Sequence, residues 1–151
     1  MEIWGKYGFG TLVNGFLKVI NPEDYLDILE KSYSRYEQAI PIFTTSIGDI
    51  IVWEKDKYIN LLIYRKGYVH VVSSGFEFFF EDLKENDFMT DELMWLPYPE
   101  AIEKDKKPEY DECFGYTPLL GLGGSEKVEN LKKVKLKEHI LVITELMGPI
   151  Q

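Results

Sequence analysis

A glycine cluster, GLGGS at residues 121–125, is the first stretch of this sequence whose composition suggests chemistry. Loops that hold dinucleotides follow the pattern G-x-G-x-x-G between a strand and a helix, so that backbone N–H groups face the phosphates. Here Glu126 stands at the place of the third glycine, and its carboxylate would repel a phosphate. A P-loop requires lysine and then serine or threonine after its last glycine, whereas Ser125 and Glu126 follow Gly124. The cluster therefore predicts a tight turn in which one or two glycines have positive φ angles.

A cysteine nucleophile with a histidine base is the second chemistry to consider. The sequence contains one cysteine, Cys113, and two histidines, His70 and His139. Asp111 and Glu112 directly precede Cys113, and negative neighbours raise the pKa of a thiol. His70 alternates with valines, which is typical of the exposed face of a strand. We therefore expect no catalytic residue and no enzyme, and keep a small hydrolase around Cys113 as an alternative that thiol-labelling kinetics would reveal.

The remaining residue types indicate neither a metal site nor a cofactor site. One cysteine and two histidines are too few for a zinc cluster of ordinary spacing. Carboxylates are dense between residues 77 and 92, but they do not follow the EF-hand pattern of a calcium loop. Trp4, Trp53 and Trp95 are interpreted as core anchors and not as a platform for a ligand. We expect no metal and no cofactor.

Length and composition predict a folded globular protein. The 151 residues suit one domain, or two small units that share a core, and 45% of them are hydrophobic. No apolar run approaches the roughly 20 residues of a membrane span, so we expect no membrane partner. The first ten residues, MEIWGKYGFG, lack the basic and apolar regions of a secretory signal. A single cysteine fits a reducing compartment, and we expect a cytoplasmic protein.

The net charge of −9 is concentrated in one segment. Residues 74–112 contain 13 Asp and Glu against 4 Lys, a difference of −9, whereas the rest of the chain contains 13 acidic and 13 basic residues. Nucleic-acid-binding proteins carry basic patches, so we expect no nucleic acid as partner. The surplus acid favours a basic protein partner, with a solvated acidic face as the plainer alternative. The candidate partner-binding residues lie on a predicted helix and in the segment after it: Glu77, Glu81, Asp82, Glu85, Asp87, Asp91 and Glu92.

The first half of the chain predicts a helix followed by an antiparallel meander. Asn21 is placed to cap a helix that runs to about Ser32, with proline and two acidic residues in its first turn. Runs rich in β-branched and aromatic residues are separated by polar turns, which favours consecutive antiparallel strands. These strands are expected at residues 49–54, 59–65 and 68–72.

The second half predicts mostly helices. Ser74 is expected to cap a helix over residues 75–86, whose apolar stripe consists of Phe76, Phe79, Phe80 and Leu83. A short helix is expected at 91–95, stopped by Pro97, and residues 100–112 resemble a linker. Residues 113–124 indicate one or two short strands and the glycine turn. The apolar spacing over 136–147 predicts a closing helix ended by Gly148 and Pro149, although 139–144 alone would also suit a strand.

These elements together predict an α+β fold. We expect an antiparallel sheet with packed helices, and a C-terminal helical subdomain on the same body. Two independently melting units joined by a mobile tether at residues 100–108 would contradict this expectation. The residues expected to be mostly buried are Trp53, Ile63, Phe79, Phe80, Leu120 and Ile140.

The sequence resembles, from end to end, bacterial immunity proteins of the Tdi type. Four stretches carry the resemblance, the first three to a GAD-like domain and the last to the C-terminal domain of the family: 8-GFGTLVNGFLKVINPEDY-25, 40-IPIFTTSIGDIIVWE-54, 76-FEFFFEDL-83 and 116-YTPLLGLGGSEKVENLKKVKLKEHILVITELMG-148. The resemblance implies a GAD-like domain at residues 1–100 and a Tdi-type immunity domain at 101–151, packed as one compact body. It supplies no binding residues.

The resemblance also implies a function. Tdi-type proteins guard against nuclease effectors of type VI secretion, so this chain is expected to bind and neutralise a secreted toxin by occluding its active surface. A nuclease must attract a polyanion, so the cognate toxin is expected to present a basic surface to the acidic residues named above. The alternative is a small-molecule or nucleotide-binding regulatory domain without catalysis, and a ligand retained in the purified protein would favour it.

Overall fold

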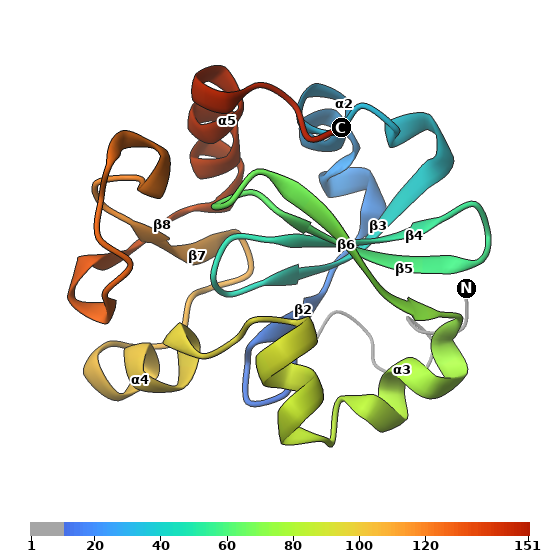
Figure 1. The fold of residues 1–151 in the computed structure, drawn as a ribbon, viewed down its shortest axis with the longest axis horizontal. Coiled ribbons are helices and arrows are strands. Elements are labelled where there is room, and N and C mark those ends of the chain that lie inside the picture. Colours follow the sequence, from blue (N-terminus) through green and yellow to red (C-terminus); the bar gives the residue numbers. More distant parts are fainter. Residues whose placement is uncertain (1–10) are drawn as a thin grey trace.

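A computed structural model describes residues 11–151, and of Gly121 only the backbone. Its centre is a six-stranded antiparallel sheet in which every strand pairs with its neighbours in the sequence, and a second sheet of two strands lies beside it (Figure 1). The strands of the main sheet are β1 (Thr11–Leu12), β2 (Leu17–Val19), β3 (Ala39–Thr45), β4 (Ile50–Glu54), β5 (Tyr58–Ile63) and β6 (Tyr68–Ser74). Those of the small sheet are β7 (Glu112–Tyr116) and β8 (Leu131–Lys135).

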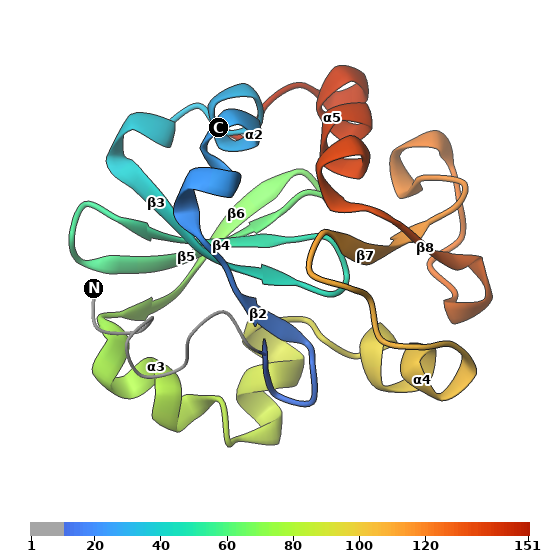
Figure 2. The same ribbon diagram turned by 180° about the vertical axis from the view of Figure 1, so that it is seen from behind.

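Helices cover both faces of the main sheet. Both views place α2 (Leu26–Ser32) and α5 (Leu136–Met147) on one face, and α3 (Phe76–Asp82) and α4 (Pro97–Lys104) on the other (Figures 1 and 2). The π-helix η3 (Phe88–Glu92) lies between α3 and α4 in sequence. The short 3-10 turns are η1 (Pro22–Asp24), η2 (Tyr36–Gln38), η4 (Leu120–Leu122) and η5 (Val128–Asn130). The expected α+β class is confirmed.

Two hydrophobic cores lie on opposite faces of this sheet. The first core joins side chains of β4 and β5 to Phe79 of α3 and to Tyr98 of α4. The second core joins the alternate side chains of the same strands to Leu29 of α2 and to Ile140 of α5. A strand covered on both faces needs apolar residues at consecutive positions. This requirement explains the uninterrupted apolar run Leu61-Leu62-Ile63. Leu61 and Ile63 lie in the first core, and Leu62 lies in the second.

Several elements confirm the sequence-based predictions. The antiparallel meander is present as β4, β5 and β6. The N–H of Glu23 donates to Asn21 Oδ1 over 3.1 Å, so Asn21 caps the helical segment as expected, although its first turn is the 3-10 turn η1. The helix α5 spans the predicted residues and ends at Gly148.

Two predicted helix boundaries were wrong. Ser74 does not cap α3, because the N-cap position is Gly75 and no side chain bonds there. The short helix expected at residues 91–95 lies earlier, as η3, and Pro97 begins α4 instead of stopping a helix. Proline suits the first turn of a helix, because its missing N–H has no intrahelical partner there. Pro97 therefore marks the start of α4.

The linker expected at residues 100–112 was also wrong. Its first part is the end of α4, and its second part is held to the main sheet by Lys18 of β2. Lys18 Nζ donates to the carbonyl oxygen of Glu109 over 2.6 Å and to that of Glu112. Burial lowers the pKa of Lys18 to about 8. A buried ammonium group with two carbonyl acceptors fixes this segment on the body.

The six residues expected to be buried all lie in a core or against one. Ile63, Phe79 and Ile140 are fully buried. The other three are half-buried and pack against the first core: Trp53, Phe80 and Leu120. Trp95 is also half-buried against that core, and Trp4 lies outside the described residues.

Candidate functional site

The seven acidic candidates lie on two neighbouring elements of one face, and we call them the acidic surface. They are Glu77, Glu81 and Asp82 on α3, Glu85 and Asp87 in the turn after it, and Asp91 and Glu92 on η3. Asp82 and Glu92 are half-buried, and the other five are exposed. Phe79 positions α3, because its ring is fully buried and stacks on Phe43 of β3 with 5.7 Å between centroids. With Phe79 turned inward, helical periodicity directs Glu77 and Glu81 outward, whereas Asp82, three residues after Phe79, lies nearer the buried side and is half-buried.

Few cations neutralise the acidic surface. Lys84 Nζ lies 3.6 Å from Glu81 Oε2, and Glu92 Oε2 is in hydrogen-bonding contact with Nε2 of His70. Within residues 11–151, the other five carboxylates of the acidic surface form no ion pair. Exposed charges of one sign that lack counter-charges add up to a field that attracts cationic partners.

Two of the six remaining acidic residues of the 74–112 segment, Asp105 and Asp111, pair with lysines of the C-terminal part. Lys133 Nζ lies 3.3 Å from Asp105 Oδ1, and Lys135 Nζ lies 3.0 Å from Asp111 Oδ2. The hydrogen bond from Lys135 lowers the pKa of Asp111. Seven of the 13 acidic residues of this segment thus belong to the acidic surface, and lysines of the small sheet offset two of the other six. Binding of a partner there stays a prediction.

Cys113 has the surroundings of a structural thiol. It lies in β7 and is fully buried in the second core. Burial raises the pKa of the Cys113 thiol to about 12, and the ammonium group of Lys18 opposes this only in part. The pKa of Cys113 is raised, as predicted. The main cause is burial, and the neighbouring Glu112 contributes less. The thiol stays protonated near neutral pH and is a poor nucleophile.

The two histidines lie in different environments. His139 of α5 flanks Gly48 together with Cys113, since a Cβ atom built on Gly48 would lie 3.3 Å from the His139 ring and 3.4 Å from the Cys113 sulfur. Burial lowers the pKa of His139 and keeps it neutral. His70 lies on β6 with its side chain 36% exposed, in line with the predicted strand face. No hydrogen bond joins a histidine to Cys113 within the described chain.

The glycine cluster forms the predicted turn. The N–H groups of Leu122, Gly123 and Gly124 donate to carbonyl oxygens of Leu119 and Leu120 over 2.9, 3.1 and 3.0 Å. Gly123 has a φ angle of +88°, and a Cβ atom on Gly124 would lie 2.1 Å from the Pro118 oxygen. These glycines are thus required by backbone geometry. A loop whose amides are used internally has none to offer a phosphate.

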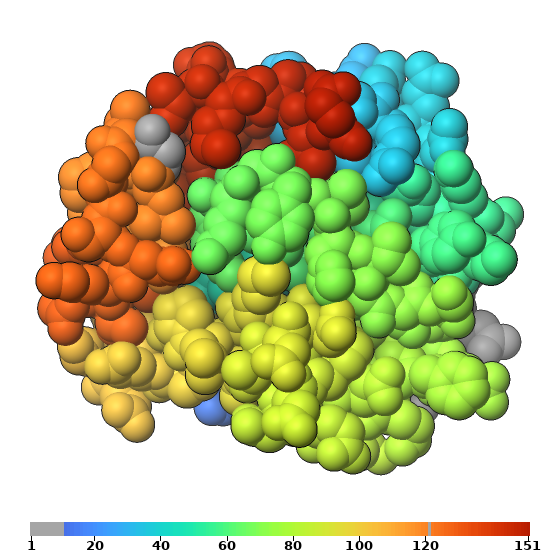
Figure 3. Space-filling model, viewed as in Figure 1, coloured from blue at the N-terminus to red at the C-terminus, as the bar shows by residue number. Residues whose placement is uncertain are grey.

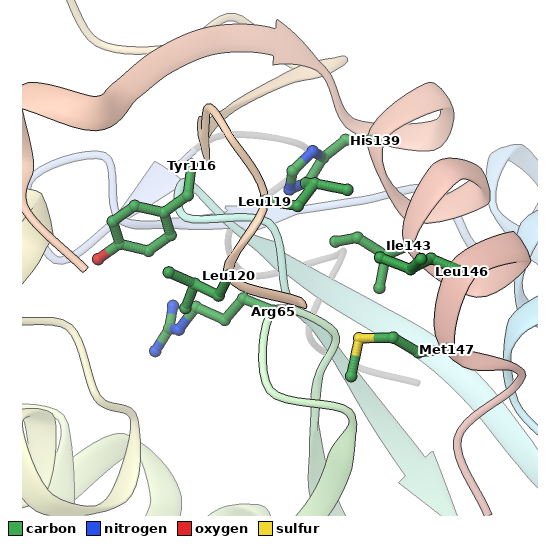
Figure 4. Close-up of a pocket in the computed structure, with 8 residues that line it drawn as sticks. All are labelled: Arg65, Tyr116, Leu119, Leu120, His139, Ile143, Leu146 and Met147. Carbon is green, nitrogen blue, oxygen red and sulfur yellow. The ribbon is translucent and has the colours of Figure 1, made fainter. Parts of the chain in front are cut away.

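A small hollow lies between this turn and α5 (Figure 4). Figure 4 shows Leu119 and Leu120 on one side and Ile143, Leu146 and Met147 on the other. The free volume is about 10 Å³, which suffices for about one water molecule. Small-molecule sites are much larger, commonly about 300–1,000 Å³. This hollow is not a ligand site.

Two larger hollows border α4. One, with a volume of about 370 Å³, is lined by aromatic and apolar side chains together with Asn14 and Glu103. The other, of about 200 Å³, lies between α4 and the small sheet and contains Lys104 and Glu129, which pair with each other over 3.6 Å. Neither presents an array of cations suited to a nucleotide phosphate. Among the described residues, no group of three or more His, Cys, Asp and Glu is arranged to hold a metal ion.

A buried ion pair fixes the sheet to the chain after η3. Arg65 Nη1 lies 3.3 Å from Asp49 Oδ2, and Arg65 Nη2 donates to the carbonyl oxygen of Met94 over 3.0 Å. Burial raises the pKa of Asp49 to about 6, with Arg65 opposing the shift. This pair was not predicted, because nothing in the spacing of residues 49 and 65 in the sequence places them together. Its position in the interior indicates a structural role.

Comparison with known proteins gives a family match and structural relatives. Residues 73–147 match the family described as T6SS immunity protein Tdi1, C-terminal, which implies a type VI secretion immunity protein. The crystal structure of Atu4351 from Agrobacterium tumefaciens has a similar fold, with a TM-score of 0.74 and 16% sequence identity over 95% of this chain and 73% of that one. At this identity the likeness shows the fold alone. No curated protein matches the sequence, and no helix among the described residues is long and apolar enough to cross a membrane.

Proposed function

We propose that this protein is the antidote to a type VI secretion toxin, which it binds and neutralises in the cytoplasm of the cell that makes it. The observation that carries the proposal is the match of residues 73–147 to the Tdi1 C-terminal family. The matched range contains the acidic surface, the glycine turn and α5. A protein that acts by binding needs a complementary surface and no catalytic group.

The toxin in this proposal is a nuclease with a basic active-site surface. Such a surface attracts nucleic acid, and an acidic protein surface can compete for the same position. The acidic surface supports this, because five of its seven carboxylates are exposed and few cations among the described residues offset them. In the complex, the acidic surface covers the basic surface of the toxin and keeps nucleic acid away from it. The antidote itself contacts neither nucleic acid nor a membrane.

The division into a GAD-like domain at residues 1–100 and a Tdi-type domain at 101–151 is part of the same proposal. Both cores support a single body, since each contains residues from before and after residue 100. The alternative of a small-molecule regulatory domain has less support. The larger of the two hollows beside α4 is bordered by Glu103, which disfavours an anionic ligand such as a nucleotide.

Co-expression with the toxin encoded beside its gene tests the proposal. Cells that make the toxin alone should stop growing and lose intact DNA, and cells that also make this protein should grow normally. The purified protein should form a complex with a catalytically inactive variant of the toxin. Failure to protect, together with no complex, would overturn the proposal. Native mass spectrometry of the purified protein covers the alternative, because a retained small molecule would favour a regulatory domain.

A further inference from the structure

The turn between β5 and β6 is surrounded by exposed apolar side chains that belong to four separate parts of the chain. They are Tyr68 of β6, Leu96 before α4, Leu122 of η4, and Leu146 and Met147 of α5, and we call them the apolar face. Each is between 42% and 63% exposed, so none of them serves mainly as core. Scattered single apolar residues on a surface are ordinary, but a contiguous group marks an interaction site.

The contacts of these residues, or of their near neighbours in the sequence, place them around the same turn. Tyr68 Oη lies 3.7 Å from the sulfur of Met94, two residues before Leu96. Met147 packs on the turn, since a Cβ atom on Gly67 would lie 2.8 Å from the Met147 methyl group. Leu146 and Met147 line the hollow of Figure 4 together with Leu119 and Leu120, and Leu120 is two residues before Leu122.

The space-filling view shows the same arrangement. The β5–β6 turn, in green, stands at the centre of Figure 3, with α5 in red above it, the glycine turn in orange to the left and the chain before α4 in yellow below. The exposed chain of α3 and η3 continues this surface downward. Glu92 connects the two regions, because it belongs to the acidic surface and contacts His70, two residues after Tyr68.

The charges around the apolar face determine what it can bind. Glu92 lies at one border, and Glu126 lies at another, where its Oε1 is 3.3 Å from Lys66 Nζ. A second copy of this chain would bring another acidic surface and another net charge of −9 into the interface. Like charges facing each other oppose association. A partner with a basic region next to a protruding apolar group fits both surfaces at once.

We propose that the apolar face is the apolar centre of the toxin-binding interface, and that the acidic surface forms its charged border. This inference rests on the proposed function and deepens it by assigning the contact that holds the complex together. Protein interfaces combine an apolar centre, where most of the binding energy resides, with a polar border. The apolar face controls how long the complex lasts, and the acidic surface controls how fast it forms.

The test compares two double variants in binding to a purified, catalytically inactive form of the toxin encoded beside this gene. Leu96→Ser with Leu122→Ser removes two side chains of the apolar face that are 63% and 62% exposed. Leu26→Ser with Ile40→Ser is the control, since these residues are 50% and 41% exposed on α2 and β3, outside the apolar face. All four side chains are exposed, so both variants should melt close to the parent.

The first variant should dissociate at least about tenfold faster than the parent at low and at high salt, and the control should stay within about twofold. Leu96→Ser alone should show part of the effect, which guards against a local disturbance of the glycine turn. Parental dissociation by a folded variant would overturn this inference and leave the proposed function intact. No binding by the parent would overturn both. A parental dimer in sedimentation that the variant abolishes would assign the apolar face to a second copy instead.

Discussion

Two acid-rich stretches of this chain look alike in the sequence and differ in the structure. Residues 77–92 carry seven carboxylates, and among the described residues one of them pairs with Lys84 and one contacts His70. Residues 105–112 carry four carboxylates, two of which pair with lysines of β8, and their backbone is held by the buried Lys18. The comparison shows that surplus charge is a property of the folded surface. Within the described chain, lysines distant in sequence offset half of the carboxylates in the second stretch and none of those in the first.

The largest expected effect concerns the anchor of the first stretch. Phe79→Ala should lower the free energy of unfolding by about 3–5 kcal/mol, because it removes a fully buried ring from the first core. The acidic surface would then lose its position, whereas the paired stretch has its own anchor. Unfolding in urea, followed by tryptophan fluorescence and circular dichroism, measures the loss. A single shared transition is expected, and two separate ones would contradict the description as one body.

Asp49 represents a third kind of acid, buried and paired with Arg65, and it should give a pH dependence of its own. Its pKa is raised to about 6 in the folded protein, so the folded state binds more protons than the unfolded state between about pH 4 and pH 6. Stability from this group is therefore greatest below about pH 4 and falls as the pH rises through 6. The change is roughly 3 kcal/mol, since each pKa unit corresponds to about 1.4 kcal/mol.

The variant Asp49→Asn cannot titrate at this position and serves as the reference. The stability difference, parent minus variant, should decrease by roughly 3 kcal/mol between about pH 4 and pH 7. Urea unfolding at several pH values measures it. A difference that does not change with pH would show that Asp49 has the same pKa in the folded and unfolded states.

Cys113→Ala should have a small effect on stability and none on protection. Removing a buried sulfur from the second core should lower the stability by about 1 kcal/mol. Toxin protection should be unchanged, because the thiol is protonated and, among the described residues, no hydrogen bond joins it to a histidine. Thiol labelling of the parent should accordingly be slow. Loss of protection by a folded Cys113→Ala protein would revive the hydrolase alternative.

The smallest expected effect probes the paired stretch directly. Lys133→Ala with Lys135→Ala should destabilise the protein slightly at low salt, and the effect should fade as salt rises, because exposed ion pairs are weak and screened. The lowered pKa of Asp111 makes the free energy of unfolding fall at acid pH, and this fall should be smaller in the variant. Stability from such a group is present above its unfolded pKa of about 4 and is lost as the pH falls through the lower folded value. Equal salt dependence in parent and variant would show that these pairs do not contribute.

The parts of the fold that the sequence predicted are those with strong periodic signals. The apolar spacing of α5 and the alternating strands around two polar turns left little choice of structure. Boundaries depended on single residues with two meanings. Pro97 is compatible with the end of one helix and with the start of the next. In the structure it begins α4, whose next residue, Tyr98, is buried in the core.

The residues of the candidate site could be predicted from the sequence, but their arrangement in three dimensions could not. Dense charge at residues 77–92 was visible from the sequence, but the pairing of β7 with β8, which brings lysines beside Asp105 and Asp111, was not. The strand β8, Leu131-Lys132-Lys133-Val134-Lys135, was missed because lysine is a poor signal for a strand. The apolar face was missed because its members come from four elements that only the tertiary fold brings together.

The rate of association with the toxin tests the central claim most directly. Glu81, Glu85 and Asp91 are changed together to Lys, and a control variant carries Glu30→Lys, Glu37→Lys and Glu138→Lys, which alters the net charge equally on exposed positions outside the acidic surface. Both variants must first melt like the parent. Surface charges act over about one Debye length, roughly 8 Å at physiological ionic strength, so the two salt concentrations compared should be about 0.05 M and 0.5 M.

We predict that reversal on the acidic surface slows association about tenfold or more at low salt, and that the difference shrinks at high salt. The control should slow association much less, because its charges lie outside the proposed interface. If carboxylates of the acidic surface are desolvated in the complex, dissociation should also become faster, at a cost of about 2–5 kcal/mol for each broken pair. Equal association rates for the parent and the reversed variant, with full protection of cells, would contradict the claim and show that the toxin docks elsewhere.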